Sequence, residues 1–182
     1  MQMWKPLIRV GTLHTFRFVV TMLSFTGVVL FLYRDSVLGA VLSPLATITA
    51  HATLVLLHLL GIEAAQVASQ IYHPGGFAYE VYYRCTGILP AAFLAVAILA
   101  YPATWSRRAV GLALGVPILI SLNLMRLVHL YCVGVHSPAT FDFVHDYIWK
   151  WLLILATFGI WFGWMSWAEG GQFYVSKKNP NK

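Results

Sequence analysis

Four stretches of this sequence are almost free of charged residues and are each about 20 residues long. They cover residues 16–33, 86–104, 109–127 and 147–167. A helix of about 20 apolar residues, rising about 1.5 Å per residue, crosses the roughly 30 Å hydrocarbon core of a bilayer. Charged residues make up only 10% of the chain, against about 25% of a typical soluble domain. These features predict a multi-pass helical membrane protein and exclude an ordinary soluble fold.

A fifth apolar stretch, residues 38–60, is harder to assign. Ser43 and Pro44 have the pattern of a helix N-terminus, and Gly61 has that of a C-terminal stop. The polar residues of the resulting helix, 44–60, recur at helical spacing and form a stripe of Thr47, His51 and His58. A span that faces lipid disfavours such a stripe. We therefore expect an amphipathic helix on the membrane surface or against the bundle.

Basic residues indicate which way the spans point, because cytoplasmic flanks are enriched in Lys and Arg. With four spans, one acid, Glu169, falls on the same side as eight bases: Lys5, Arg9, Arg17, Arg107, Arg108, Lys177, Lys178 and Lys182. The opposite side carries four bases and five acids. If 38–60 also crossed, the basic N-terminus and the basic tail would lie on opposite sides. The pattern predicts four spans in the cell (inner) membrane with both termini cytoplasmic, so the net charge of +6 reflects orientation in the lipid bilayer and not binding to nucleic acid.

The segment before the second span has the alternation of β-strands. Residues 67–73 and 77–84 flank Pro74-Gly75-Gly76, which predicts a β-hairpin at 67–84. One face of its second strand carries Phe77, Tyr79, Val81 and Tyr83, and Cys85 continues it. The predicted fold class is an all-α polytopic membrane protein with an outer amphipathic helix and a small β-hairpin. It forms a single domain, 1–182, with an uncleaved first span and a disordered tail at 177–182.

Three residues that can carry chemistry meet at the outer ends of the predicted spans. Cys85 opens the second span, Arg126 lies near the end of the third, and His145 precedes the fourth. A cysteine is nucleophilic as the thiolate, which a nearby cation favours, and Arg126 is placed either to do this or to hold an oxyanion. His145 is placed to take the thiol proton and return it to a leaving amine. Two residues are candidate supports: Asn123, one turn before Arg126, and Asp146, beside His145.

Each of these residues also has a plain structural explanation. Cys85 could simply fill space in the core as a small buried residue. Arg126 could pair with Asp142 or contact lipid headgroups, and Asn123 could form hydrogen bonds between helices. The outer aromatic residues fit either a peptide groove or an interfacial belt, and they are Tyr72, Phe77, Tyr79, Tyr82, Tyr83 and Tyr131.

Two rival sites use the histidines or the cysteines differently. Six histidines on the outer side make a metal or haem site the alternative function: His51, His58, His73, His129, His136 and His145. No HExxH or CxxC motif accompanies them, so we predict no cofactor and no metal. A disulfide between Cys85 and Cys132 is the second rival, but it leaves Arg126 and His145 unexplained. A transporter is disfavoured because no span carries a carboxylate.

Three short segments carry the ordered Cys, Arg and His set: Arg84-Cys85-Thr86-Gly87-Ile88, Asn123-Leu124-Met125-Arg126 and Phe143-Val144-His145-Asp146. Together with the upstream Val81-Tyr82-Tyr83, they resemble the exosortase/archaeosortase family. The resemblance covers about 38–167. Because the chain is short, it is closer to compact members such as the exosortase H type.

The resemblance implies a polytopic membrane cysteine protease or transpeptidase that acts at the outer face. Members of the family process membrane-anchored proteins whose C-terminal sorting signal combines a short motif, a transmembrane helix and a basic cluster. They are thought to join the new C-terminus to a surface acceptor. On this basis Cys85 matches the family's nucleophile, Arg126 its essential arginine and His145 its histidine.

Overall fold

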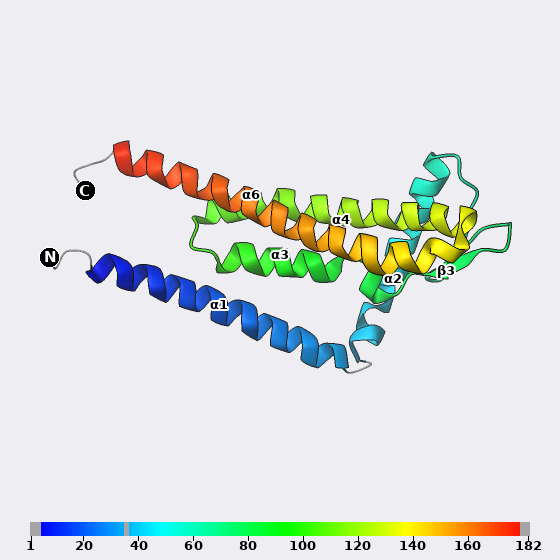
Figure 1. Cartoon of the computed structure of the whole chain (residues 1–182), viewed down its shortest axis with the longest axis horizontal. Helices are drawn as coiled ribbons and strands as arrows, with labels where there is room; N and C mark the ends of the chain where they lie inside the picture. The colour runs from blue at the N-terminus through cyan, green and yellow to red at the C-terminus, as the bar shows by residue number, and fades with distance from the viewer. Residues whose placement is uncertain (1–4, 35–36, 179–182) are drawn as a thin grey trace.

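The computed structural model describes residues 5–34 and 37–178 and is mostly helical, with one small sheet (Figure 1). Its long helices are α1 (Lys5–Arg34), α2 (Val37–Leu59), α3 (Ile88–Ala100), α4 (Trp105–His136) and α6 (Trp149–Lys178). Short helical turns lie between them: η1 (Tyr83–Cys85), η2 (Pro138–Thr140), α5 (Phe141–Phe143) and η3 (Val144–Ile148). Helices α3, α4 and α6 form a bundle, and α2 crosses it near one end. The predicted helical membrane architecture is confirmed at this level.

Three segments of the described chain are long and apolar enough to cross a membrane: Leu42–Leu59, Trp105–His136 and Pro138–Glu169. Two shorter apolar helices accompany them, Phe16–Val29 and Ile88–Ala100. The 13 residues of α3 rise only about 20 Å, so this helix is shorter than the span predicted at 86–104. It ends there because Tyr101 precedes Pro102, and the residue before a proline favours extended backbone.

The other predicted spans lie within longer helices. Helix α1 contains 16–33 and α4 contains 109–127, whereas 147–167 begins in η3 and continues through α6. Helix α6 extends to Lys178, so it includes the first two residues of the predicted tail, 177–182. Residues 179–182 lie outside the described part of the chain.

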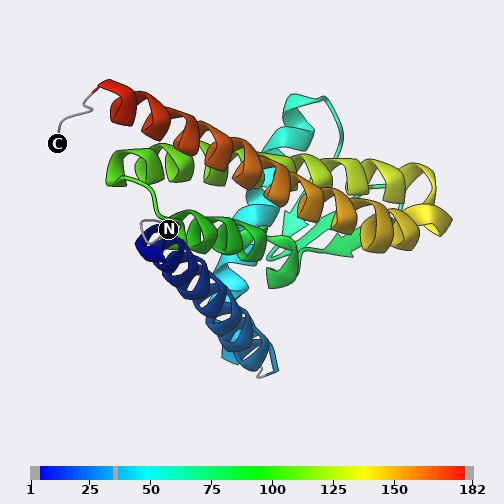
Figure 2. The ribbon, with the colours of Figure 1, turned by 60° about the vertical axis from the view of Figure 1, so that its left-hand side comes forward.

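Helix α2 begins earlier than predicted. It starts at Val37, and Pro44 lies inside it, so the Ser43-Pro44 pair does not mark its N-terminus. An internal proline removes one backbone hydrogen bond but does not have to end a helix whose neighbours hold it. The helix runs across the direction of α4 and α6 in both views (Figures 1 and 2).

The polar stripe of α2 meets the segment that follows the helix. Nδ1 of His51 lies 3.3 Å from Oε1 of Gln66, and Nε2 of Gln66 donates to the carbonyl oxygen of Thr47 at 3.2 Å. Nε2 of His58 lies 2.9 Å from the carbonyl oxygen of Ala64. The stripe therefore holds the first strand against α2.

The predicted hairpin is present, but a third strand extends it. Strands β1 (Ala65–Val67), β2 (Gln70–Tyr72) and β3 (Ala78–Glu80) form an antiparallel sheet in that order. Strands β2 and β3 pair with Ile71 opposite Tyr79. The extra strand arises because Ala68, with φ +53°, turns the chain inside the stretch predicted as one strand. A positive φ at alanine is costly, so alternation alone does not reveal this turn.

The described core consists of two clusters. One lies at the end of the bundle that carries the sheet, here called the sheet end, and contains Ala50, Leu57, Ile71, Val81, Cys85, Leu127 and Tyr131. The other lies at the end that carries the α3–α4 connection, here called the loop end, and contains Leu94, Ile98, Leu119, Trp164 and Ala168.

Polar contacts join the helices at the loop end. Nε1 of Trp164 donates to the carbonyl oxygen of Arg107 at 2.9 Å, and Nη2 of Arg108 donates to that of Tyr101 at 2.9 Å. The Tyr101 hydroxyl donates to Glu169. Burial raises the pKa of Tyr101 to about 12, and the bond to Glu169 adds to the rise. This phenol therefore stays a neutral donor that ties the connection to α6.

Because α4 packs closely on α6 at the loop end, substitution of two helix glycines by alanine should affect the free energy of unfolding differently. A Cβ at Gly111 would lie 2.3 Å from Nε1 of Trp164, whereas a Cβ at Gly159 meets nothing within 4 Å. We expect Gly111→Ala to lower the free energy of unfolding by about 1–3 kcal/mol through overpacking. Gly159→Ala should be neutral or raise it by up to about 1 kcal/mol. Thermal unfolding in detergent measures both, and equal midpoints would contradict the packing described.

Candidate active site

A cavity of about 1210 Å³ opens between α1, α3 and α6. The residues that line its polar end are Arg84, Cys85, Arg126, His145, Asp146 and Lys150. The rest of the lining is predominantly apolar and follows α3 and α6 toward the loop end. The structure thus brings the three predicted catalytic residues to one end of one cavity.

A short turn and a glycine position Cys85. The cysteine lies on η1 and is buried, and Gly87, with φ +76°, redirects the chain into α3. A Cβ at Gly87 would lie 2.9 Å from Cβ of Asn123, so this position needs glycine both for its backbone and for its approach to α4. The Cys85-Thr86-Gly87 sequence therefore places the cysteine on a turn of its own, ahead of the helix.

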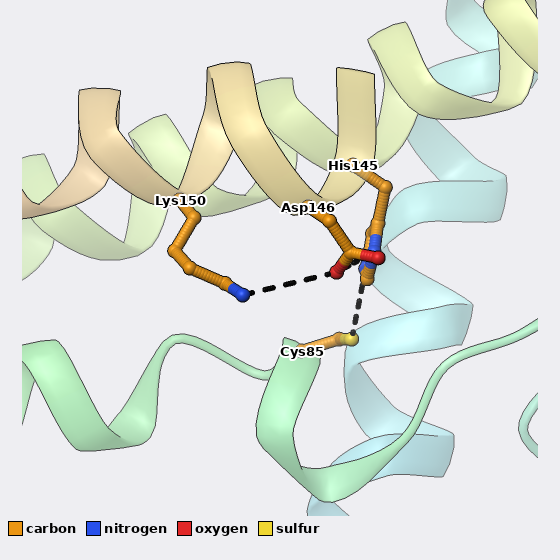
Figure 3. Close-up of polar contacts among 4 residues, drawn as sticks. All are labelled: Cys85, His145, Asp146 and Lys150. Atoms are coloured by element: carbon orange, nitrogen blue, oxygen red, sulfur yellow. Dashed lines mark hydrogen bonds and ion pairs between the residues drawn. The ribbon is translucent and has the colours of Figure 1, made fainter. Parts of the chain in front are cut away.

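Cys85 faces His145 across the cavity (Figure 3). Its Sγ lies 3.8 Å from Nε2 of His145, and Nδ1 of His145 lies 3.2 Å from Oδ1 of Asp146. Nζ of Lys150 lies 3.9 Å from the same carboxylate oxygen. The ring of Phe141 stacks on the imidazole at 5.9 Å between centroids and 7° between planes. These contacts hold the imidazole with Nε2 toward the thiol.

His145 and Asp146 lie together in a π-helical turn. Adjacent residues of an α-helix point about 100° apart, a direction that does not favour contact between their side chains. Residues Val144–Ile148 form a π-helix instead. A π turn holds more residues, so adjacent side chains diverge less, and such turns often occur at functional sites.

Asn123 and Arg126 approach the cysteine from α4. Both are buried, and Nδ2 of Asn123 donates to the carbonyl oxygen of Cys85 at 2.8 Å. Nη1 of Arg126 lies 3.5 Å from Oδ1 of Asn123. In the described part of the chain, Nε of Arg126 has no hydrogen-bond partner, and no ion pair joins Arg126 to Asp142. A buried guanidinium that lines the cavity is thus left with capacity to bind an anionic group.

Tyr79, named above only among the aromatic residues of a groove or belt, is a neighbour of this site. Its hydroxyl donates to the carbonyl oxygen of Leu127 at 3.2 Å. Burial raises the pKa of Tyr79, the thiol of Cys85 adds to the rise, and the Arg126 cation opposes it. The phenol therefore stays neutral and ties β3 to α4 beside the site. The shared face of Tyr79 and Cys85 on the predicted strand was the available signal.

Three of the six outer aromatic residues, Phe77, Tyr79 and Tyr131, pack against one another. Contacts join Phe77 to Tyr79, to Tyr131 and to Phe141 at centroid distances of 5.7–6.2 Å. These rings therefore form part of the core at the sheet end. This arrangement differs from both predictions, a peptide groove and an interfacial belt. Tyr82 and Tyr83 do line the cavity.

The remaining outer histidines have separate partners. His73 accepts from the backbone N–H of Gly75 at 2.9 Å, and His129 accepts from Nε1 of Trp149 at 3.0 Å. Nδ1 of His136 lies 2.9 Å from the carbonyl oxygen of Cys132. Over residues 5–34 and 37–178, no group of three or more His, Cys, Asp or Glu side chains is arranged to hold a metal ion. Cys85 and Cys132 are both free thiols, so neither rival site gains support.

Comparison with known families accords with this geometry. The family model described as transmembrane exosortase matches residues 7–165, which is most of the chain. The chain belongs to the transmembrane exosortase family. No curated protein and no solved structure gives a significant match. Membership indicates a membrane-bound protein-sorting protease or transpeptidase of the cysteine type that acts on membrane-anchored substrates. The matched region of this exosortase contains the whole polar end of the cavity.

Two left-handed glycines offer a matched test of the site. Gly87 and Gly61 both have positive φ, but only at Gly87 would a Cβ meet Asn123. We expect Gly61→Ala to cost about 1–2 kcal/mol through backbone strain alone. Gly87→Ala should cost about 1–3 kcal/mol more through the clash, and should slow alkylation of Cys85 by moving it from His145. Thermal unfolding and maleimide labelling in a Cys132→Ala background measure both effects. Indistinguishable variants would refute the proposed fit of Gly87 against α4.

Proposed function

We propose that this exosortase is a cysteine transpeptidase that cleaves the C-terminal sorting signal of exported, membrane-anchored proteins and transfers the new C-terminus to a surface acceptor. The observation that carries the proposal is the 3.8 Å contact between Sγ of Cys85 and Nε2 of His145. Arg126 lines the same end of the cavity. Nucleophile, base and cation are the parts that acyl transfer requires.

The proposed topology has four spans, α1, α3, α4 and α6, with the sheet end outside and both termini cytoplasmic. From Trp105 to Arg126, α4 rises about 32 Å, close to the thickness of the hydrocarbon core. Arg107 and Arg108 then flank the membrane on the cytoplasmic side, and Arg126 reaches the outer interface. Helix α2 lies across the sheet end, where its polar stripe binds the strand segment.

The first half of the reaction forms an acyl-enzyme. Nε2 of His145 takes the thiol proton of Cys85, and the thiolate attacks the scissile carbonyl carbon. The new C–S bond places negative charge on the carbonyl oxygen, which Arg126 stabilises. The intermediate collapses, the C–N bond breaks, and the amine of the departing segment takes the proton from His145. A thioester on Cys85 remains.

The second half regenerates the enzyme. An acceptor amine, or water, gives a proton to His145 and attacks the thioester carbonyl. The C–S bond then breaks, and the cysteine sulfur recovers the proton from His145. Asp146 holds the proton on Nδ1, so that Nε2 is free to act as the base. Asn123 fixes the Cys85 turn through its carbonyl and orients Arg126.

Replacement of Cys85 tests the function directly. The substrate is a reporter ending in the C-terminal segment of a candidate exported protein from the same genome, preferably one encoded nearby, with a short motif, a transmembrane helix and a basic cluster. Cys85→Ala should reduce processing at least about a thousandfold, because covalent catalysis is lost. Cys132→Ala is the matched control and should keep it. Immunoblots measure cleavage, and mass spectrometry of the new C-terminus separates transfer from hydrolysis. Processing that survives Cys85→Ala would overturn the proposal.

The substitution Arg126→Lys tests whether the site needs only a positive charge at this position or also the planar shape of the guanidinium. The substitution keeps a cation but loses the planar fork that reaches an oxyanion while bound to Asn123. We expect the rate of cleavage to fall about a hundredfold while the variant remains folded and inserted. An unchanged rate would assign Arg126 a structural role only.

A further inference from the structure

The cavity extends well beyond the site of the proposed chemistry. From Cys85 it follows α3 as far as Ala97 and α6 as far as Trp161. Its walls here are mainly apolar and include Met22 from α1, Phe93 from α3 and Phe158 from α6. Between Lys150 and Trp161, α6 rises about 16 Å. The mechanism proposed above uses only one end of this space.

The apolar part of the cavity offers an occupant almost no hydrogen bonds. Its two hydroxyls are already used, since Thr26 donates to the carbonyl oxygen of Met22 at 2.8 Å and Thr157 to that of Leu153 at 2.7 Å. An extended peptide would leave its backbone polar groups unsatisfied there, which is strongly unfavourable. A chain in this space must therefore satisfy its own backbone, as a helix does.

The volume of the cavity is of the order of that of one short helix. A helix about 10 Å wide and 15 Å long, roughly ten residues, occupies about 1200 Å³. The cavity has about 1210 Å³. At the loop end, Phe18 of α1 stacks on Trp161 of α6 at 5.7 Å. Helix α3 packs against both α1 and α6, whereas α1 diverges from α6 toward the sheet end (Figure 2); all three helices line the cavity.

From these observations we infer that the apolar part of the cavity binds the substrate's own transmembrane helix, which enters from the bilayer between α1 and α6. This inference rests on the proposed function, because it takes the chain cleaved at Cys85 to be the chain that continues into the cavity. The helix is the segment C-terminal to the scissile bond and departs with the leaving amine. The scissile bond then lies just before the helix begins, in the polar end of the cavity where extended backbone finds partners.

Two membrane-bound probes with the same reactive group test the inference. One is a 20-residue Leu/Ala helix with a C-terminal Lys pair and an N-terminal bromoacetyl group. The other is the bromoacetyl amide of hexadecylamine, which brings the same group to the membrane on a lipid chain. In each reaction the Cys85 thiolate displaces bromide and forms a thioether. The rate of Cys85 alkylation is measured in proteoliposomes, in a Cys132→Ala background.

The helical probe should alkylate Cys85 at least about tenfold faster than the lipid probe, because the cavity raises its local concentration. Thr157→Trp fills the cavity and should remove this advantage. Leu155→Trp should keep it, because Leu155 lies on the same helix, is 68% exposed and does not line the cavity. Unchanged thermal midpoints and unchanged labelling by a small maleimide show that both variants retain the fold and the thiol.

The outcomes separate this inference from the proposed function. Equal rates for the two probes would overturn the helix site, as would an advantage that survives Thr157→Trp. A lipid probe that reacts faster and is blocked by Thr157→Trp would show that the cavity holds a lipid chain instead. In each of these cases, slowing of both probes by His145→Ala would still support the Cys85–His145 pair. Rates that are insensitive to His145→Ala would count against the function itself.

Discussion

The hydrogen bond from Asn123 to the carbonyl oxygen of Cys85 joins the parts of this molecule on which the site depends. It joins η1 to α4 in a buried environment. If the bond were lost, no water would be at hand to take the place of either partner. One turn further along α4, Arg126 borders the same cavity. Gly87 permits the close approach of the two chains. Two residues of α4 and the turn η1 are thereby held in register, while His145 approaches the site from η3.

Structure and chemistry are divided between the two ends of the bundle. The loop end is held by tightly packed aromatic and small residues, such as Trp164 on Gly111, and by bonds to backbone carbonyls. The sheet end supplies the thiol, the imidazole and the guanidinium. In the proposed orientation these groups lie at the interface, where a charge costs far less than at the centre of a bilayer. The apolar bundle therefore needs no ionised group in its middle.

Local sequence was sufficient for the features that depend on composition and order. Uncharged stretches predicted the helices, and topology alone brought Cys85, Arg126 and His145 together. Features that depend on packing were not foreseeable. Pro44 reads as a helix start by its local preference, but the helix continues through it. The turn at Ala68 goes against residue preference, and the π turn that aims Asp146 at His145 has no sequence signature. The cavity is lined by residues of α1, α3 and α6, and no local pattern encodes how these helices are placed.

The stacked rings of Phe18 and Trp161 have a consequence for the cell's energy supply. A protease site that opens both to water and to lipid is a weak point in a membrane that stores a proton gradient. Here the two rings stack at the end of the cavity away from Cys85, and Tyr101 packs on Trp161. A dry aromatic constriction repels hydrated ions and breaks any chain of water molecules. In the proposed orientation the stack lies between the polar end of the cavity and the cytoplasm, where it would oppose such a leak.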